Sequence, residues 1–175
     1  MTRNNTDANA DLTHVRADGS SHMVDVSGKA VTTREASASA TLTSRTDVID
    51  RILTGDLPKG EALSVARVAG IMAAKRTHEL IPLCHPLPIT KVTIDFSRLA
   101  PEILEVNARV KTEGKTGVEM EALTAASVAA LTVYDMIKAV DHLAVIGDVK
   151  VLAKSGGKSG DWDREVASGE KGGAA

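Results

Sequence analysis

The segment "VAALTVYDMIKAVD", residues 128–141, places a carboxylate and an amine, Asp135 and Lys138, three residues apart in an apolar stretch rich in helix formers. Side chains at this spacing lie on one face of a helix, so the pair is either a solvated ion pair or part of an active site. The opposite face is also apolar, which is typical of a helix that is buried or at a subunit interface. An ion pair there is costly unless it has a purpose. The pattern leaves both interpretations open.

The same helix carries a second candidate pair near its start. At 100° per residue, Met120 and Glu121 fall within about 60° of Asp135 around the helix axis. Along the axis, however, Glu121 and Asp135 are separated by roughly 21 Å at about 1.5 Å per residue. One pocket can use both only if its ligand is long or if two chains contribute. We favour two chains.

A proline-stiffened loop, "LIPLCHPL", presents Cys84 and His85. One Cys and one His are too few for a structural zinc site, which needs four ligands. A Cys–His nucleophile pair is disfavoured because neighbouring side chains on a loop tend to diverge. We interpret His85 as a hydrogen-bond donor or proton carrier to a ligand.

Two glycine-rich segments could contact an anion. "AKSGGKSGD" ends like a phosphate-binding P-loop, but Leu152 stands where the first glycine is required and no helix follows. Lys154 and Lys158 therefore either bind an anion without forming a P-loop or belong to a basic tail. Gly114 and Gly117 precede a helix start, where backbone amides suit an anion or a carbonyl oxygen, although a plain turn fits equally well.

The elements that must position these residues follow from periodicity. Alternation predicts strands at 36–43, 91–99, 103–113 and 144–155, the middle two forming an antiparallel hairpin. Helical spacing predicts helices from Thr46, as N-cap, to Gly55, over 61–79 and over 118–140. This order predicts an α+β fold with the helices on one face of an antiparallel sheet.

Composition narrows the class of protein. The net charge of -2 and the single Phe, Tyr and Trp argue against nucleic-acid binding. We expect no signal peptide or membrane span, and the single Cys84 fits a reducing, cytoplasmic location. We expect residues 1–18 to be disordered, 19–161 to form one domain and 162–175 to be a flexible tail.

Together, "HMVDVSGKA", "VAGIMAAKRT", "LIPLCHPL", "KTGVEMEALTAASVAALTVYDMIKAV" and "VLAKSGGKSG" resemble the molybdenum cofactor biosynthesis protein C family. The resemblance covers roughly residues 12–161. It implies a ferredoxin-like subunit in a homo-hexamer, a trimer of dimers with active sites at the dimer interfaces. It implies a phosphorus–oxygen lyase that acts after a radical GTP cyclase. The substrate would be the cyclised dihydroguanosine triphosphate made from GTP, and the products cyclic pyranopterin monophosphate and pyrophosphate.

The resemblance also implies roles for particular residues. Asp135, Lys138 and Lys59 match catalytic residues, the two lysines transferring protons and Asp135 orienting Lys138. Substrate binding is implied for the remaining matches: Leu83, Cys84, His85, Met120, Glu121 and Lys154. Arg34 and Lys75 are further candidates for holding the triphosphate. No metal ligand and no required cofactor are implied, while magnesium accompanying the triphosphate stays open. The competing class is a non-catalytic, oligomeric nucleotide-binding module.

Overall fold

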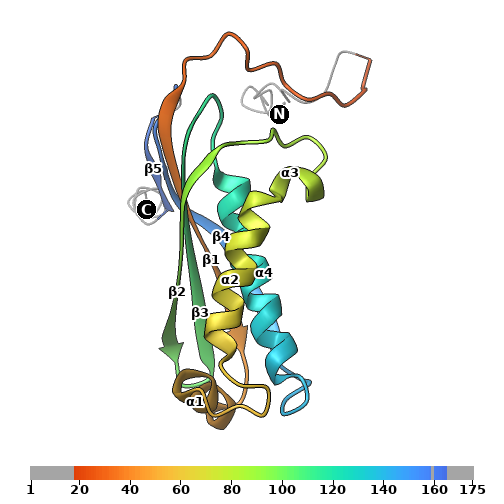
Figure 1. Cartoon of the computed structure of the whole chain (residues 1–175), viewed down its shortest axis with the longest axis vertical. Helices are drawn as coiled ribbons and strands as arrows, with labels where there is room; N and C mark the ends of the chain where they lie inside the picture. Colours follow the sequence, from red (N-terminus) through yellow and green to blue (C-terminus); the bar gives the residue numbers. More distant parts are fainter. Residues whose placement is uncertain (1–17, 159, 165–175) are drawn as a thin grey trace, which may run out of the picture.

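The computed structural model describes residues 18–158 and 160–164 (Figure 1). In chain order its elements are β1 (Thr32–Thr43), α1 (Thr46–Thr54), α2 (Ala62–Lys75), α3 (Thr77–Leu80), β2 (Ile89–Ala100), β3 (Ile103–Gly114), α4 (Glu119–Ile137), β4 (Val145–Ser155) and β5 (Trp162–Asp163).

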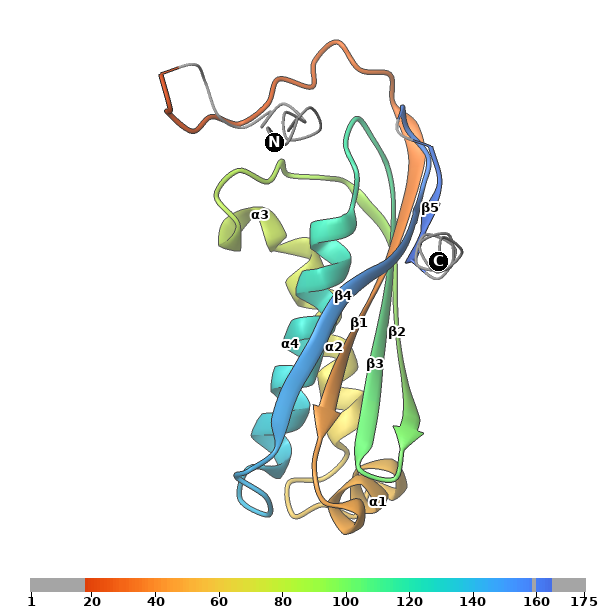
Figure 2. The same cartoon turned by 180° about the vertical axis from the view of Figure 1, so that it is seen from behind.

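The strands form one antiparallel sheet in the order β2-β3-β1-β4-β5 (Figures 1 and 2). The first four strands and the helices that connect them give the ferredoxin-like arrangement, in which β1 lies between β3 and β4. The predicted hairpin is confirmed, because β2 and β3 pair across a turn at Pro101 and Glu102.

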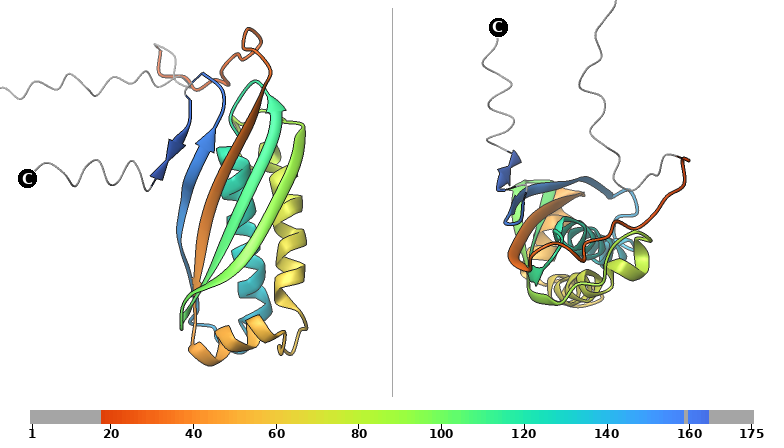
Figure 3. Two further views of the ribbon diagram at one scale, coloured as in Figure 1. Left: turned by 90° about the vertical axis from the view of Figure 1, so that its left-hand side faces the viewer. Right: turned by 90° about the horizontal axis from the view of Figure 1, so that it is seen from above.

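Helices α2 and α4 cover one face of the sheet, as Figure 3 shows. On β1, Ala36, Ala38, Ala40 and Leu42 point to the helices and are fully or almost fully buried. These small side chains let α4 approach the sheet closely. At Gly70 on α2, an added Cβ would lie only 2.8 Å from the carbonyl oxygen of Ala125 on α4, so the two helices also touch closely.

Several predicted boundaries were wrong. The predicted helix over 61–79 is broken at Arg76, where α2 ends and the short α3 begins. Arg45, and not Thr46, stands at the N-cap of α1, with no side-chain cap hydrogen bond, whereas the predicted end at Gly55 is confirmed by its left-handed φ of 76°. Helix α4 ends at Ile137, three residues before the predicted end.

The expected start of the flexible tail, at residue 162, differs from the structure. Trp162 and Asp163 pair with Lys154 and Ala153, so a short edge strand lies where the flexible tail was expected to begin. The expected disorder concerns residues 1–18, of which only Asp18 lies within the described residues. Of the rest of the expected tail, only Arg164 does.

Helix α4 has the length and apolar composition of a membrane span, although no such run was expected. About half of that stretch is buried inside the domain, against the sheet and α2. We interpret α4 as the core helix of a soluble domain, because its buried face packs on protein.

Candidate active site

A carboxylate held by two lysines lies at the C-terminal end of α4. The Nζ atom of Lys138 lies 2.8 Å from Oδ1 of Asp135. The Nζ atom of Lys59, from the turn before α2, donates to the backbone oxygen of Asp135 at 2.7 Å and lies 3.3 Å from Oδ2. The fold therefore brings together the three residues expected to be catalytic, although Lys59 is far from the other two in sequence.

This carboxylate–lysine cluster is open to solvent within one chain. The side chains of Lys59, Lys138 and Asp135 are 42%, 53% and 56% exposed. Hydrogen bonds from Lys138 and then Lys59 lower the pKa of Asp135, and the Asp135 carboxylate raises the pKa of Lys138. The pKa of Lys138 thus lies above its ordinary value. In this geometry Lys138 is a cation that can donate a proton, and Asp135 is a carboxylate.

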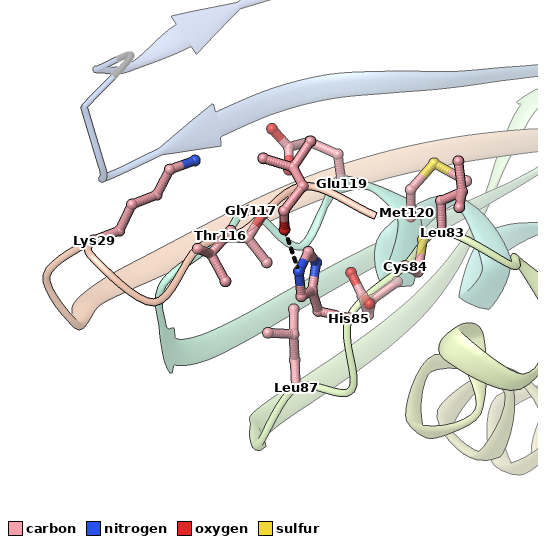
Figure 4. Close-up of a pocket in the computed structure, with 12 residues that line it drawn as sticks. Lys29, Leu83, Cys84, His85, Leu87, Thr116, Gly117, Glu119 and Met120 are labelled. Atoms are coloured by element: carbon pink, nitrogen blue, oxygen red, sulfur yellow. Dashed lines mark hydrogen bonds between the residues drawn. The ribbon is translucent and has the colours of Figure 1, made fainter. Parts of the chain in front are cut away.

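A cavity of about 280 Å³ lies at the other end of α4 (Figure 4). Three segments line it: the chain before β1, the loop before β2, and the turn and first residues of α4. Its lining residues are Val24, Val26, Lys29, Leu83, Cys84, His85, Leu87, Thr116, Gly117, Glu119, Met120 and Glu121. The expected tripeptide and the expected Met–Glu pair therefore meet in one place.

Glu121 is the buried acid of this cavity, with 4% of its surface exposed. Burial, reinforced by the nearby negative charge of Glu119, raises the pKa of Glu121 to about 7. A carboxyl group with such a pKa can give or accept a proton near neutral pH. Burial also raises the pKa of the Cys84 thiol, which keeps it protonated and argues against a thiolate nucleophile.

His85 binds the chain segment that crosses the cavity. Its Nε2 lies 2.9 Å from the backbone oxygen of Val24, drawn as the dashed line in Figure 4. The Nζ of Lys115 donates to the backbone oxygen of Ser27 at 2.6 Å. The first contact joins Val24 to the loop before β2, and the second joins Ser27 to the turn before α4; Lys29, two residues further on, lines the cavity.

A second cavity of about 170 Å³ adjoins the first and shares Lys29, Thr116, Gly117 and Glu119 with it. It is lined in addition by Arg34, Glu35, Lys154, Ser155 and Gly156. Three cationic side chains thus face a small space beside the turn before α4. The three cations outnumber the two acids of this lining, Glu35 and Glu119, and such an excess of positive charge suits a phosphate group.

Arg34 is fixed within this second cavity. Its Nε donates to the backbone oxygen of Gly114 at 3.0 Å, and its guanidinium packs where a side chain at Gly157 would stand. Gly156 and Gly157 have φ values of 85° and 77°, a left-handed conformation that glycine adopts readily. The glycine pair in "KSGGKSG" therefore has a structural reason besides any role toward an anion.

The expected site residues thus fall into two groups at opposite ends of α4. Asp135, Lys138 and Lys59 form one group, and the expected binding residues form the other around the two cavities. By helical spacing Glu121 lies on the same side of α4 as Asp135, but it is buried, whereas Asp135 is exposed. Of the two extra phosphate candidates, Arg34 lines the second cavity and Lys75, the last residue of α2, lines neither.

Sequence reasoning missed Lys29 and Glu119 as lining residues. Lys29 belongs to "HMVDVSGKA", a segment on which the resemblance rested, so a signal for it was present. Glu119 falls nearly opposite Asp135 on a helix, away from the side that carries the other candidate residues. At the first turn of α4 that direction faces the second cavity.

These features define a ferredoxin-like protein equipped to bind an anionic ligand and to transfer protons. The model of the MoaC family matches residues 23–157, and this chain belongs to the MoaC family.

Curated relatives support the same assignment. The chain is 67% identical over 153 residues to the cyclic pyranopterin monophosphate synthase of Corynebacterium efficiens, covering 87% of this chain and 98% of that protein. It is 58% identical over 153 residues to the synthase of Streptomyces avermitilis, covering 87% and 89%. The synthase of Chloroflexus aurantiacus is 53% identical over 160 residues, covering 91% and 98%.

Proposed function

We propose that this protein is a cyclic pyranopterin monophosphate synthase of molybdenum cofactor biosynthesis. It converts the cyclised dihydroguanosine triphosphate derived from GTP into cyclic pyranopterin monophosphate and releases pyrophosphate. The observation that carries this proposal is the family match over 23–157, which includes every expected site residue. The reaction is that of a phosphorus–oxygen lyase, and it takes place in the cytoplasm after a radical GTP cyclase has supplied the substrate.

The chemistry needs proton transfer and neutralisation of phosphate charge. A sugar hydroxyl attacks the α-phosphorus, its proton passes to a base, and the bond to pyrophosphate breaks. Rearrangement of the purine-derived ring requires further proton transfers and no redox change. Glu121, with a pKa of about 7, is suited to exchange protons with the ring. Lys154, Arg34 and Lys29 are suited to the triphosphate.

The carboxylate–lysine cluster supplies the second set of groups. Because Asp135 raises the pKa of Lys138, we propose that Lys138 acts as a proton donor or as a cation facing developing negative charge. Lys59 would serve beside it as the second proton-transferring lysine. No cofactor is needed for these steps, and any magnesium would arrive with the triphosphate.

We propose that each active site combines the cavities of one subunit with the carboxylate–lysine cluster of a dimer partner. The separation of roughly 21 Å along α4 supports this arrangement, because it is too long for one compact pocket. The helical layer also carries exposed apolar side chains that a partner could cover: Val65, Val68 and Met72 on α2 and Leu131 on α4 are 49%, 58%, 49% and 56% exposed. The hexamer, a trimer of dimers, is part of this proposal.

The test is incubation of the purified protein with the cyclised triphosphate, following pyrophosphate and pyranopterin formation together. A synthase releases both products in equal amounts, and Asp135→Asn releases neither. A nucleotide-binding module would bind the triphosphate without releasing pyrophosphate. Binding without turnover would therefore refute the enzymatic proposal.

A further inference from the structure

An acidic side chain occupies the cationic cavity where a phosphate would be expected. Oε1 of Glu119, in the first turn of α4, lies 3.2 Å from Nζ of Lys154 on β4. Both residues line the second cavity, and their side chains are 31% and 32% exposed. The lysine expected to bind substrate phosphate is therefore paired with a carboxylate of the same chain.

The turn before α4 leaves room for this carboxylate. A Cβ at Gly117 would lie 1.9 Å from Oε2 of Glu119, so the side chain folds back over the glycine. The atoms that a methyl group would meet belong to the far end of a flexible side chain. Glu119 can therefore move away without a change in the backbone.

Arg34 and Glu35, which also line the cavity, have other partners. Arg34 is bound by the backbone oxygen of Gly114, a neutral group that does not compete as an anion. Glu35, the second acid lining the cavity, pairs with Arg109 at 3.4 Å. The Glu119–Lys154 pair thus joins an anion and a cation across the space that a phosphate would fill.

We propose that Glu119 is an anionic placeholder. It pairs with Lys154 until a phosphate group of the substrate takes its place, and this displacement is repeated each time a new substrate molecule binds. This inference rests on the proposed function, since it takes the displacing anion to be the substrate's triphosphate. A polyphosphate carries more negative charge than a carboxylate and offers more acceptor oxygens, so it competes successfully for the lysine. By returning to Lys154, Glu119 favours release of pyrophosphate.

The test is calorimetric titration of the intact protein with pyrophosphate. Because Glu119→Gln removes both the competing ion pair and a repelling charge, we expect about five-fold tighter binding than in the wild-type protein. The gain should shrink as ionic strength rises. Glu102→Gln is the matched control, since it makes the same change of charge at an exposed turn at the other end of β3, and its affinity should equal that of the wild type.

Unchanged or absent pyrophosphate binding in Glu119→Gln would overturn the placeholder role. Weaker binding would also overturn it, because it would mean that Glu119 orients Lys154 toward the ligand. Gly117→Ala is a second variant that leaves the charge unchanged but pushes the Glu119 carboxylate aside, and it should also bind pyrophosphate more tightly.

A crystal structure of the wild-type protein with pyrophosphate gives an independent readout. We expect Nζ of Lys154 to contact a phosphate oxygen and to have left Glu119. A pair retained at 3.2 Å beside bound pyrophosphate would contradict the proposal. Failure of the proposed function is recognised separately, because wild-type protein would then form no pyranopterin product whatever these titrations show.

Discussion

Replacing Glu121 by glutamine should change the pH dependence of stability. Glu121 is 4% exposed, and its pKa is raised from 4.5 to about 7 in the folded protein. The folded state therefore keeps a proton that the unfolded state loses between these two pH values. The stability associated with that proton is fully present below pH 4.5 and is lost as the pH rises to about 7.

The magnitude follows from the size of the shift. At about 1.4 kcal/mol per pKa unit, the wild-type protein loses roughly 3 kcal/mol across this window because of Glu121. Glutamine has a similar shape and no charge, so Glu121→Gln does not suffer this loss. We expect the stability of the variant relative to wild type to rise by roughly 2–3 kcal/mol between pH 5 and pH 8.

Urea denaturation at pH 5 and pH 8, at one protein concentration, measures this difference. Other titrating groups are common to both proteins and cancel when the variant is compared with the wild type at each pH. Glu102→Gln, at an exposed position, should show no pH-dependent difference. The reasoning would be refuted if Glu121→Gln differed from wild type equally at both pH values, since Glu121 would then have an ordinary pKa.

Three further predictions concern other parts of the molecule. Asp135→Asn should abolish product formation while circular dichroism and the oligomeric state stay unchanged, because this exposed side chain holds lysines rather than the core; a variant with near-normal turnover would contradict the role of Asp135. Gly70→Ala should destabilise the protein by about 1–3 kcal/mol in thermal unfolding, because the new methyl group would lie 2.8 Å from the carbonyl oxygen of Ala125; unchanged stability would mean that α2 and α4 separate easily. Asp141→Ala should lower the melting temperature by several degrees, because Ser44 Oγ and two backbone N–H groups lose their acceptor, whereas Asp141→Asn, which keeps an acceptor oxygen, should lower it less.

Local patterns were sufficient for the elements with strict periodicity. Alternation along 91–99 and 103–113 identified β2 and β3, because one face of β3 is buried and the matching face of β2 is buried or partly buried. The break between α2 and α3 could not be predicted in the same way, because neither glycine nor proline marks it. Thr77 Oγ1 donates to the backbone oxygens of Ala73 and Ala74 there, and such side-chain competition with the helix leaves no periodic trace.

The candidate site was predictable in its residues and only partly in its geometry. Helical spacing gave the length that separates Glu121 from Asp135 and their common side of the helix, but it could not give their different exposure. The loop before β2 and the chain before β1 lie over the start of α4, so Glu121 is buried, while Asp135 at the far end is exposed. Contacts between distant segments also decide that Lys59 reaches Asp135 and that Glu119 reaches Lys154.

The measurement that tests the central claim most directly is complementation between subunits altered at opposite ends of α4. Lys59 and Asp135 touch within one chain, so variants of these two residues cannot distinguish the subunits. The informative pair is Asp135→Asn and His85→Ala, each of which should be inactive alone. If a site combines the two ends from two subunits, a heterodimer contains one intact site and one doubly altered site. Random reassociation of equal amounts should then restore roughly a quarter of wild-type synthase activity. A mixture that reassociates and stays inactive would contradict the shared site.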